Sequence, residues 1–264
     1  MKKIISTVVL MLVIALSASS QHGEVKKSTI VIIPGSWSSP ADWGYVVPQL
    51  KAAGNEVIVV NLPGHGTDKT PIASITLQSY VDAVKKAIGT KTNITLVAHS
   101  FGGVVANQVA EEMPSQIREL LYIAAYVPKS GESLLTLATS DGDSHLGKVL
   151  QIKEKEGIAV VPKESIVDVF FADAPKQVQE YVVVSFPIEP LAPLAAPVKL
   201  TDANFGKLKK VYVFTEYDHV NSPALQHRMV TDNNITKTYT IPSSHTAFVS
   251  MPDVVAGIIN NEAR

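Results

Sequence analysis

The sequence predicts an α/β fold: a mainly parallel sheet flanked by helices, with a largely helical cap inserted into it. Three observations lead to this prediction. Short apolar runs rich in β-branched residues alternate with longer amphipathic runs. The short runs do not strictly alternate apolar and polar residues, which is typical of strands covered on both faces. One stretch of about 80 residues interrupts the rhythm and is too long for a simple connection.

The composition suits a globular chain with a sizeable core. The chain has 264 residues, of which 46% are hydrophobic and 18% charged, enough for one large domain or two small ones. The formal net charge of −1 does not indicate a nucleic acid or an anionic membrane as a partner. The chain has no cysteine, so it has no disulfide and no thiolate metal site.

Residues 1–20 are predicted to be a secretory signal peptide, and residues 21–264 the domain. Two lysines precede an apolar run from Ile4 to Leu16, and small residues follow up to a plausible cleavage point after Ser20. The alternative is a membrane anchor, but a spanning helix needs roughly 20 apolar residues and this run is shorter. We therefore expect an exported protein, in a bacterial periplasm or the medium, without a stable membrane anchor.

The core is expected in residues 28–128 and 209–264. Six apolar runs predict its strands: Ser28–Gly35, Asn55–Gly64, Asn93–Ser100, Glu119–Pro128, Lys209–Glu216 and Thr236–Ser244. Helical spacing predicts its helices: Pro40–Gly54, Ser79–Ile88, Gly102–Met113, Pro223–Val230 and Pro252–Asn261. Strands that alternate with helices in this way predict a parallel sheet.

Residues 129–208 are predicted to be a cap that folds over the strand ends. They contain several helix-like runs and the proline-rich segment "FPIEPLAPLAAPVKL". The alternative is a separate small domain.

Ser100 lies between a predicted strand and a predicted helix, in "TLVAHSFGGVV". A nucleophile on a sharp strand-to-helix turn needs small residues two positions before and after it, because backbone segments approach closely there. Ala98 and Gly102 meet this requirement, and Gly103 follows. The alternative is that Ser100 only caps the helix, since serine is a common N-cap.

A nucleophilic serine also needs a base and a group that orients the base. Enzymes with this turn carry them in the order Ser, then Asp or Glu, then His. His245 in "IPSSHTAF" follows the last predicted strand and is the predicted base. Asp218 is the predicted acid, because it lies beyond the end of the preceding strand; Glu216 is the alternative, and either could be a solvated loop carboxylate. We expect His99 to be structural.

An oxyanion hole needs two backbone N–H donors. We assign one to Phe101, the residue after the serine. The second is assigned to Ser36, in the loop that follows the first strand. The alternative for Ser36 is a plain loop in which Gly35 only makes the turn.

The chain resembles the α/β-hydrolase superfamily, and within it the group of plant methylesterases, plant hydroxynitrile lyases and related bacterial carboxylesterases. The resemblance runs from about Thr29 to Ile259 and rests on these segments: "IIPGSWSSPADWGYVVPQLKAAGNEVIVVNLPGHG", "LVAHSFGGVV", "YIAAYVP", "FFADAP", "EPLAPLAAP", "VYVFTEYDHVNSPALQHRM" and "IPSSHTAF". It implies the α/β-hydrolase fold, a triad of Ser100, Asp218 and His245, and oxyanion amides at Ser36 and Phe101.

Two departures from the family pattern concern specificity. Pro34 and Gly35 stand where the family commonly has His-Gly. In the lyases a threonine follows that histidine and a lysine follows the catalytic histidine, whereas this chain has Gly35 and Thr246 at those positions. The resemblance therefore implies ester hydrolysis rather than lyase activity.

The expected function is that of a serine carboxylesterase acting on small to medium uncharged esters through an acyl-enzyme, without a metal or an organic cofactor. Lactonase, cofactor-free perhydrolase or lyase activity on the same fold are alternatives, as is a binding protein that has lost turnover. No sequence pattern indicates an oligomeric state. Aromatic residues are predicted to contact the substrate, although those of the cap could equally be cap core: Trp37, Phe170, Phe171 and Phe186, with Phe101 beside the serine.

Overall fold

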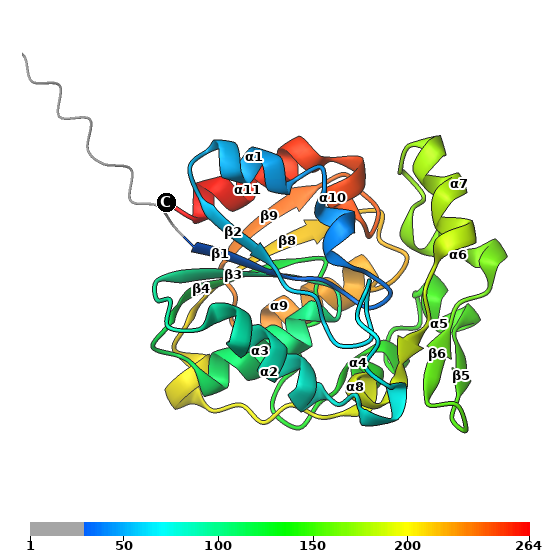
Figure 1. The fold of residues 1–264 in the computed structure, drawn as a ribbon, viewed down its shortest axis with the longest axis horizontal. Helices are drawn as coiled ribbons and strands as arrows, with labels where there is room; N and C mark the ends of the chain where they lie inside the picture. Colours follow the sequence, from blue (N-terminus) through cyan, green and yellow to red (C-terminus); the bar gives the residue numbers. More distant parts are fainter. Residues whose placement is uncertain (1–28) are drawn as a thin grey trace, which may run out of the picture.

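A six-stranded parallel sheet forms the centre of the molecule (Figure 1). The structure, a computed structural model, describes residues 29–264, so the predicted signal peptide lies outside the described residues. The strands are β1 (Thr29–Ile33), β2 (Glu56–Val59), β3 (Ile94–His99), β4 (Ile117–Ile123), β8 (Lys209–Thr215) and β9 (Lys237–Ile241). Their order in the sheet is β2-β1-β3-β4-β8-β9, and every neighbouring pair is parallel.

All six predicted core strands are present, with shifted ends. Two runs end well before their predicted ends: Asn55–Gly64 forms a strand only up to Val59, and Glu119–Pro128 only up to Ile123. Ala124 has a left-handed φ of +45°, a conformation that a strand does not accommodate. Residues 125–128 therefore form a buried apolar loop that follows the carboxyl end of β4, rather than a part of the strand.

Helices cover both faces of the sheet (Figure 1). On one face lie α2 (Leu77–Ile88), α3 (Gly102–Glu112) and α9 (Pro223–Asp232); on the other lie α1 (Val47–Ala52), α10 (Ala247–Ser250) and α11 (Pro252–Glu262). The prediction of one helix over Pro40–Gly54 was wrong. That segment forms a short 3₁₀ helix, η1 (Pro40–Trp43), and then α1, which starts afresh next to Pro48 because proline is accepted in a first helical turn but not inside a helix.

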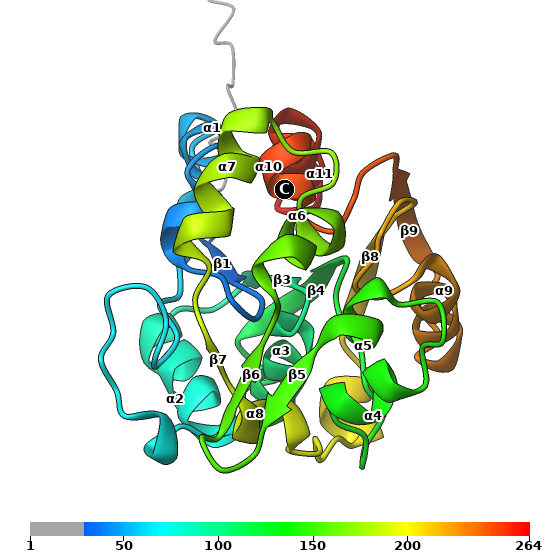
Figure 2. The ribbon, with the colours of Figure 1, turned by 90° about the vertical axis from the view of Figure 1, so that its right-hand side faces the viewer.

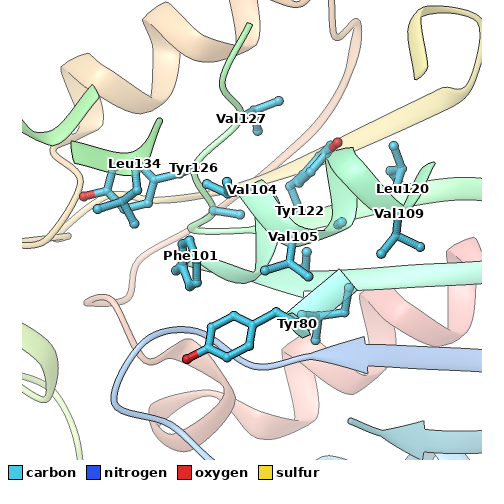
Figure 3. Close-up of a cluster of buried hydrophobic side chains, with 14 of the residues drawn as sticks. Tyr80, Phe101, Val104, Val105, Val109, Leu120, Tyr122, Tyr126, Val127 and Leu134 are labelled. Carbon is cyan, nitrogen blue, oxygen red and sulfur yellow. The ribbon is translucent and has the colours of Figure 1, made fainter. Parts of the chain in front are cut away.

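The two faces of the sheet carry separate hydrophobic cores. In β1, Val31 and Ile33 belong to the core under α2 and α3, whereas Ile30 and Ile32 belong to the core under α1 and α11. Both sets are fully buried, which explains why the strand sequences are apolar without alternation. Figure 3 shows part of the larger core, where the α3 side chains lie among aromatic residues from α2, β4 and the loop after β4.

Most of the segment 129–208 lies at the carboxyl ends of the strands and in front of them in Figure 2, whereas its last residues return to the start of β8. It contains the helices α4 (Leu134–Thr139), α5 (His145–Val149), α6 (Lys163–Phe170), α7 (Lys176–Ser185) and α8 (Leu191–Ala195), and a π-helical turn, η3 (Asp202–Gly206). It also contains a small antiparallel sheet that the sequence did not predict, made of β5 (Gln151–Lys153), β6 (Ile158–Val160) and β7 (Glu189–Pro190).

Within residues 29–264, every helix is too short or too polar to cross a membrane.

Candidate active site

Ser100 occupies a strained turn between β3 and α3. Its φ is +52°, in the left-handed region that a residue with a Cβ rarely adopts. The carbonyl of Ser100 accepts hydrogen bonds from the backbone N–H groups of Gly103 (3.1 Å) and Tyr126 (3.0 Å), which hold the turn from two sides. This is the geometry expected of a nucleophile elbow.

The glycines after Ser100 are required by close backbone contacts. A Cβ on Gly102 would lie 2.4 Å from the carbonyl oxygen of Ile33, and one on Gly103 would lie 2.2 Å from the carbonyl oxygen of Tyr126. Neither position therefore tolerates a side chain without movement of the backbone. The predicted reason for a small residue is confirmed at Gly102, because α3 packs directly on the end of β1, and Gly103 packs in the same way on the loop after β4.

The helix-capping alternative for Ser100 does not describe this turn. Helix α3 begins at Gly102, its N-cap residue is Phe101, and no side chain caps it. Ser100 lies one position before the cap and lines a pocket instead.

His245 and Asp218 form a buried pair at the ends of β9 and β8. The Nδ1 atom of His245 lies 2.9 Å from Oδ2 and 3.1 Å from Oδ1 of Asp218, and the two side chains are only 2% and 0% exposed. The Nε2 atom of His245 is buried and has no hydrogen-bond partner among the described residues. An imidazole fixed at one nitrogen and free at the other can take up a proton from a neighbouring hydroxyl.

The surroundings of Asp218 distinguish it from Glu216. Its carboxylate accepts hydrogen bonds from the hydroxyl of Thr215 (2.8 Å) and the backbone N–H of Val220 (2.8 Å), among others. Glu216, two positions earlier, is exposed. The structure therefore brings Asp218, rather than Glu216, to the histidine.

His99, the residue before Ser100, contacts His245 and so connects it to the elbow. Its Nε2 atom lies 3.0 Å from the carbonyl oxygen of His245, and the two rings are 4.6 Å apart. Burial, and then the proximity of His245, hold the pKa of His99 well below its usual value. His99 is therefore a neutral residue whose Nε2–H donates a hydrogen bond to a backbone carbonyl, in keeping with the structural role expected of it.

The loop after β1, residues 34–39 (the β1 loop), lies against Ser100. A Cβ on Gly35 would lie 2.7 Å from Cβ of Ser100, which shows how closely the two segments approach. Among residues 29–264, the backbone N–H groups of Ser36 and Phe101 donate no hydrogen bond. Two unpaired amides beside a strained serine are what an oxyanion hole requires.

Comparison with known proteins fits this geometry. A family model described as "Alpha/beta hydrolase family" matches residues 30–258. The chain belongs to the α/β-hydrolase family. The resemblance expected from the sequence is thereby confirmed.

Individual relatives come from the same group. The chain is 26% identical over 256 residues to putative methylesterase 11, chloroplastic, of Arabidopsis thaliana, covering 91% of this chain and 65% of that protein. It is 24% identical to methylesterase 7 of the same plant, covering 89% of this chain and 95% of that protein. The chain spans between half and two-thirds of the length of the first curated relatives that it matches. A crystal structure of a pyrethroid hydrolase from Sphingobium faniae JZ-2 shares the fold, with a TM-score of 0.79 and 22% identity over 89% of this chain and 97% of that one.

A buried carboxylate that the sequence analysis missed supports the β1 loop of this α/β hydrolase. Oε2 of Glu189, in β7, accepts a hydrogen bond of 2.7 Å from the backbone N–H of Trp37 and lies 2.9 Å from Nε2 of His65. Burial opposes protonation of His65, but Glu189 outweighs it and raises the pKa of His65. The only sequence signal was a carboxylate within the otherwise apolar segment "FPIEPLAPLAAP".

A pocket of about 450 Å³ opens at Ser100. Its wall is mostly apolar and comes from the β1 loop, the loop after β4, the cap and the loop after β8: Trp37, Tyr126, Leu134, Leu135, Ala138, Leu146, Leu150, Ile152, Leu194 and Val220. A larger hollow of about 720 Å³ lies elsewhere and is lined mainly by charged and polar residues, with none of the predicted site residues. We therefore take the smaller pocket as the substrate site.

The predicted aromatic residues separate into two groups. Trp37 lines the pocket. Phe170, Phe171 and Phe186 are not among the lining residues; they pack against one another, and the rings of Phe170 and Phe186 lie 5.5 and 6.1 Å from that of Trp37. Phe170 and Phe186 therefore pack against Trp37, and contact of the three cap phenylalanines with a substrate stays a prediction.

The cap also holds the loop after β9, residues 242–246, that carries the histidine. The hydroxyl of Thr246 donates a 2.7 Å hydrogen bond to the carbonyl of Phe170, at the end of α6. The carboxylate of Asp173 accepts hydrogen bonds from the backbone N–H (2.8 Å) and the hydroxyl of Ser244. The hydroxyl of Thr246 is therefore engaged in a hydrogen bond to the cap, at the position where the plant hydroxynitrile lyases have a lysine.

Proposed function

We propose that the protein is a serine carboxylesterase that hydrolyses small to medium uncharged esters. The observation that carries the proposal is the buried pair of Asp218 and His245, which leaves Nε2 of His245 unpartnered beside a strained serine elbow. The names of the relatives, methylesterases and a pyrethroid hydrolase, support ester hydrolysis.

In the proposed mechanism, Oγ of Ser100 attacks the ester carbonyl while Nε2 of His245 takes up the hydroxyl proton. Asp218 keeps the imidazole oriented and stabilises the imidazolium. The amides of Ser36 and Phe101 donate hydrogen bonds to the oxyanion. The imidazolium then protonates the departing alkoxide, which leaves as an alcohol. Water attacks the acyl-enzyme, His245 takes the proton of that water, and the carboxylic acid is released as Ser100 is regenerated.

The pocket supports the proposed substrate class. Its wall is almost free of charged side chains, with Asp141 and Lys148 as the exceptions, and Asp141 is already bonded to the backbone N–H and hydroxyl of Ser222. A volume of about 450 Å³ accommodates a small to medium ester. Lys148 is exposed, so its ammonium group stays hydrated, and a charged acyl or alkyl group would lose its own hydration without gaining a buried partner.

The decisive experiment is hydrolysis of p-nitrophenyl esters, from acetate to octanoate, by the wild type and Ser100→Ala. We expect turnover by the wild type and a loss of roughly 10⁴-fold or more in the variant. A serine-directed fluorophosphonate should label the wild type at Ser100 alone. Equal turnover by both proteins, or labelling of the variant, would refute the proposed nucleophile.

We also propose that the protein is exported by its N-terminal segment, on the strength of the signal-peptide pattern in residues 1–20. Mass spectrometry of the purified protein should find a new N-terminus near residue 21 in the periplasmic or secreted fraction. An intact N-terminus with all of the protein in the cytoplasm would contradict export.

A further inference from the structure

Two histidines and an aspartate from three separate segments meet beside the loop after β8. His145 begins α5, Asp168 lies in α6, and His219 follows Asp218 in the β8 loop, residues 216–222. Nδ1 of His145 lies 2.8 Å from Oδ2 of Asp168, and Nδ1 of His219 lies 3.2 Å from Oδ1 of the same carboxylate. The two imidazole rings are stacked with their centroids 3.8 Å apart.

The spacing of these ligand atoms suits a single small cation. Zn²⁺ binds imidazole nitrogen and carboxylate oxygen at about 2.0–2.2 Å, so neighbouring ligand atoms of a tetrahedral site lie roughly 3.3 Å apart. One ligand atom from each of the three residues lies within 4.8 Å of the other two. Small rotations of exposed side chains would bring them to the ideal distances.

The arrangement presents two imidazole nitrogens to one carboxylate, because the rings are stacked and both Nδ1 atoms lie close to Asp168. A divalent cation suits this set of groups, because it binds both imidazoles in their neutral form and is partly neutralised by the carboxylate. The mixture of two imidazoles and one carboxylate favours Zn²⁺ over the hard cations Mg²⁺ and Ca²⁺, which prefer oxygen ligands.

We propose that His145, Asp168 and His219 form a zinc site that binds the cap to the β8 loop. The ligands are the two Nδ1 atoms and an oxygen of Asp168. The three side chains are 39%, 57% and 32% exposed, so water can complete the coordination. Without a metal, the Nδ1–H group of His219 donates a hydrogen bond to the backbone carbonyl of Asp168, with an N···O distance of 2.9 Å. A bound metal would replace the hydrogen on this nitrogen.

The position of the site predicts that a bound metal stabilises the contact between the cap and the β8 loop. The backbone N–H groups of His145 and Leu146 already donate hydrogen bonds to the carbonyl of His219, at 2.9 and 3.2 Å. A metal at the three side chains would add a second connection between the same segments. It would therefore stabilise the folded protein, since the three ligands are brought together only by the fold. This inference does not depend on the proposed esterase reaction.

The test is calorimetric titration of the untagged, metal-free protein with ZnCl₂, together with thermal unfolding with and without Zn²⁺. The wild type should bind one Zn²⁺ per chain and unfold at least about 5 °C higher at a concentration 100 times Kd. His145→Gln and His219→Gln keep an amide that can donate to Asp168 but remove a zinc ligand. Each should weaken binding by about 100-fold or more and abolish the thermal shift.

The matched control is His227→Gln, which replaces an exposed histidine of α9 that packs on Phe214, away from the cluster. It should bind Zn²⁺ as tightly as the wild type. The proposal is overturned if the wild type does not bind Zn²⁺ at this stoichiometry, or if the two cluster variants bind it as tightly as the control. Esterase assays play no part in either outcome.

Discussion

The carboxylate of Glu189 accepts a 2.7 Å hydrogen bond from the backbone N–H of Trp37 and so connects the cap to the β1 loop. Trp37 has a φ of +54°, a left-handed conformation that needs support from its surroundings. The amide of the preceding residue, Ser36, is one of the two assigned to the oxyanion. We therefore expect Glu189 to be a positioning residue for the proposed oxyanion hole, although it is part of the cap and does not line the pocket with Ser100.

We predict that Glu189→Ala lowers kcat and stability together, while Glu189→Gln largely restores both. Alanine leaves the amide of Trp37 and the imidazole of His65 without their buried acceptor, which should cost about 3–5 kcal/mol of unfolding free energy. Glutamine keeps an oxygen at the position that receives both bonds. Steady-state kinetics should show the loss mainly in kcat for alanine and a kcat within about tenfold of the wild type for glutamine. Glu164→Ala, at an exposed position of α6, is the control; an alanine variant with wild-type kcat would contradict the positioning role.

Stability should depend on pH through His65 and Glu189. Because Glu189 raises the pKa of His65 in the folded state, the folded protein binds this proton more tightly than the unfolded chain. The stabilisation is complete below the unfolded value of about 6.5 and is lost as the pH rises through the folded pKa. Urea unfolding between about pH 5.5 and 8.5 should therefore show a stability difference between wild type and Glu189→Gln that shrinks as the pH rises. A difference that stays constant over this range would rule out the linkage.

Gly103→Ala should strongly destabilise the protein. Its Cβ would lie 2.2 Å from a backbone carbonyl oxygen, that of Tyr126, which cannot rotate away. We expect a loss of about 3 kcal/mol or more by chemical denaturation and a matching loss of activity, since the serine turn must shift. Gly257→Ala is the matched control, because Gly257 lies inside α11 and a Cβ there meets nothing within 4 Å. That variant should be unchanged or more stable by up to about 1 kcal/mol, from the higher helix propensity of alanine.

Ala138→Phe should shorten the preferred acyl chain. Ala138 lies in α4 and lines the pocket, so a larger side chain there fills space that a long acyl group would occupy. The ratio of kcat/KM for octanoate to that for acetate should fall about tenfold or more, since each displaced methylene group costs about 1 kcal/mol. Ala195→Phe, at an exposed position of α8 outside the pocket, should leave the ratio unchanged. An unaltered ratio in Ala138→Phe would mean that the acyl chain binds elsewhere.

The sequence alone determined the features that depend on local pattern. Apolar runs predicted all six core strands, because a strand buried on both faces must be apolar throughout. The small residues around Ser100 predicted the elbow, because its close contacts are made by the turn and the adjacent strand ends. The order Ser, Asp, His along the chain predicted Asp218 and His245 as partners, and the structure brings these two together because the carboxyl ends of the parallel strands β8 and β9 lie at one edge of the sheet.

Only the tertiary structure decided which side chains meet across long separations. Burial and hydrogen bonds distinguish Asp218, which contacts the histidine, from the exposed Glu216. The segment Pro40–Gly54 forms two short helices instead of one, and the cap contains a small sheet. The tertiary structure brought Glu189 to a residue 152 positions away, and His145 and His219 to the one carboxylate of Asp168. Local propensity carries no information about such contacts, because they depend on how the cap packs on the strand ends rather than on the neighbours of each residue along the chain.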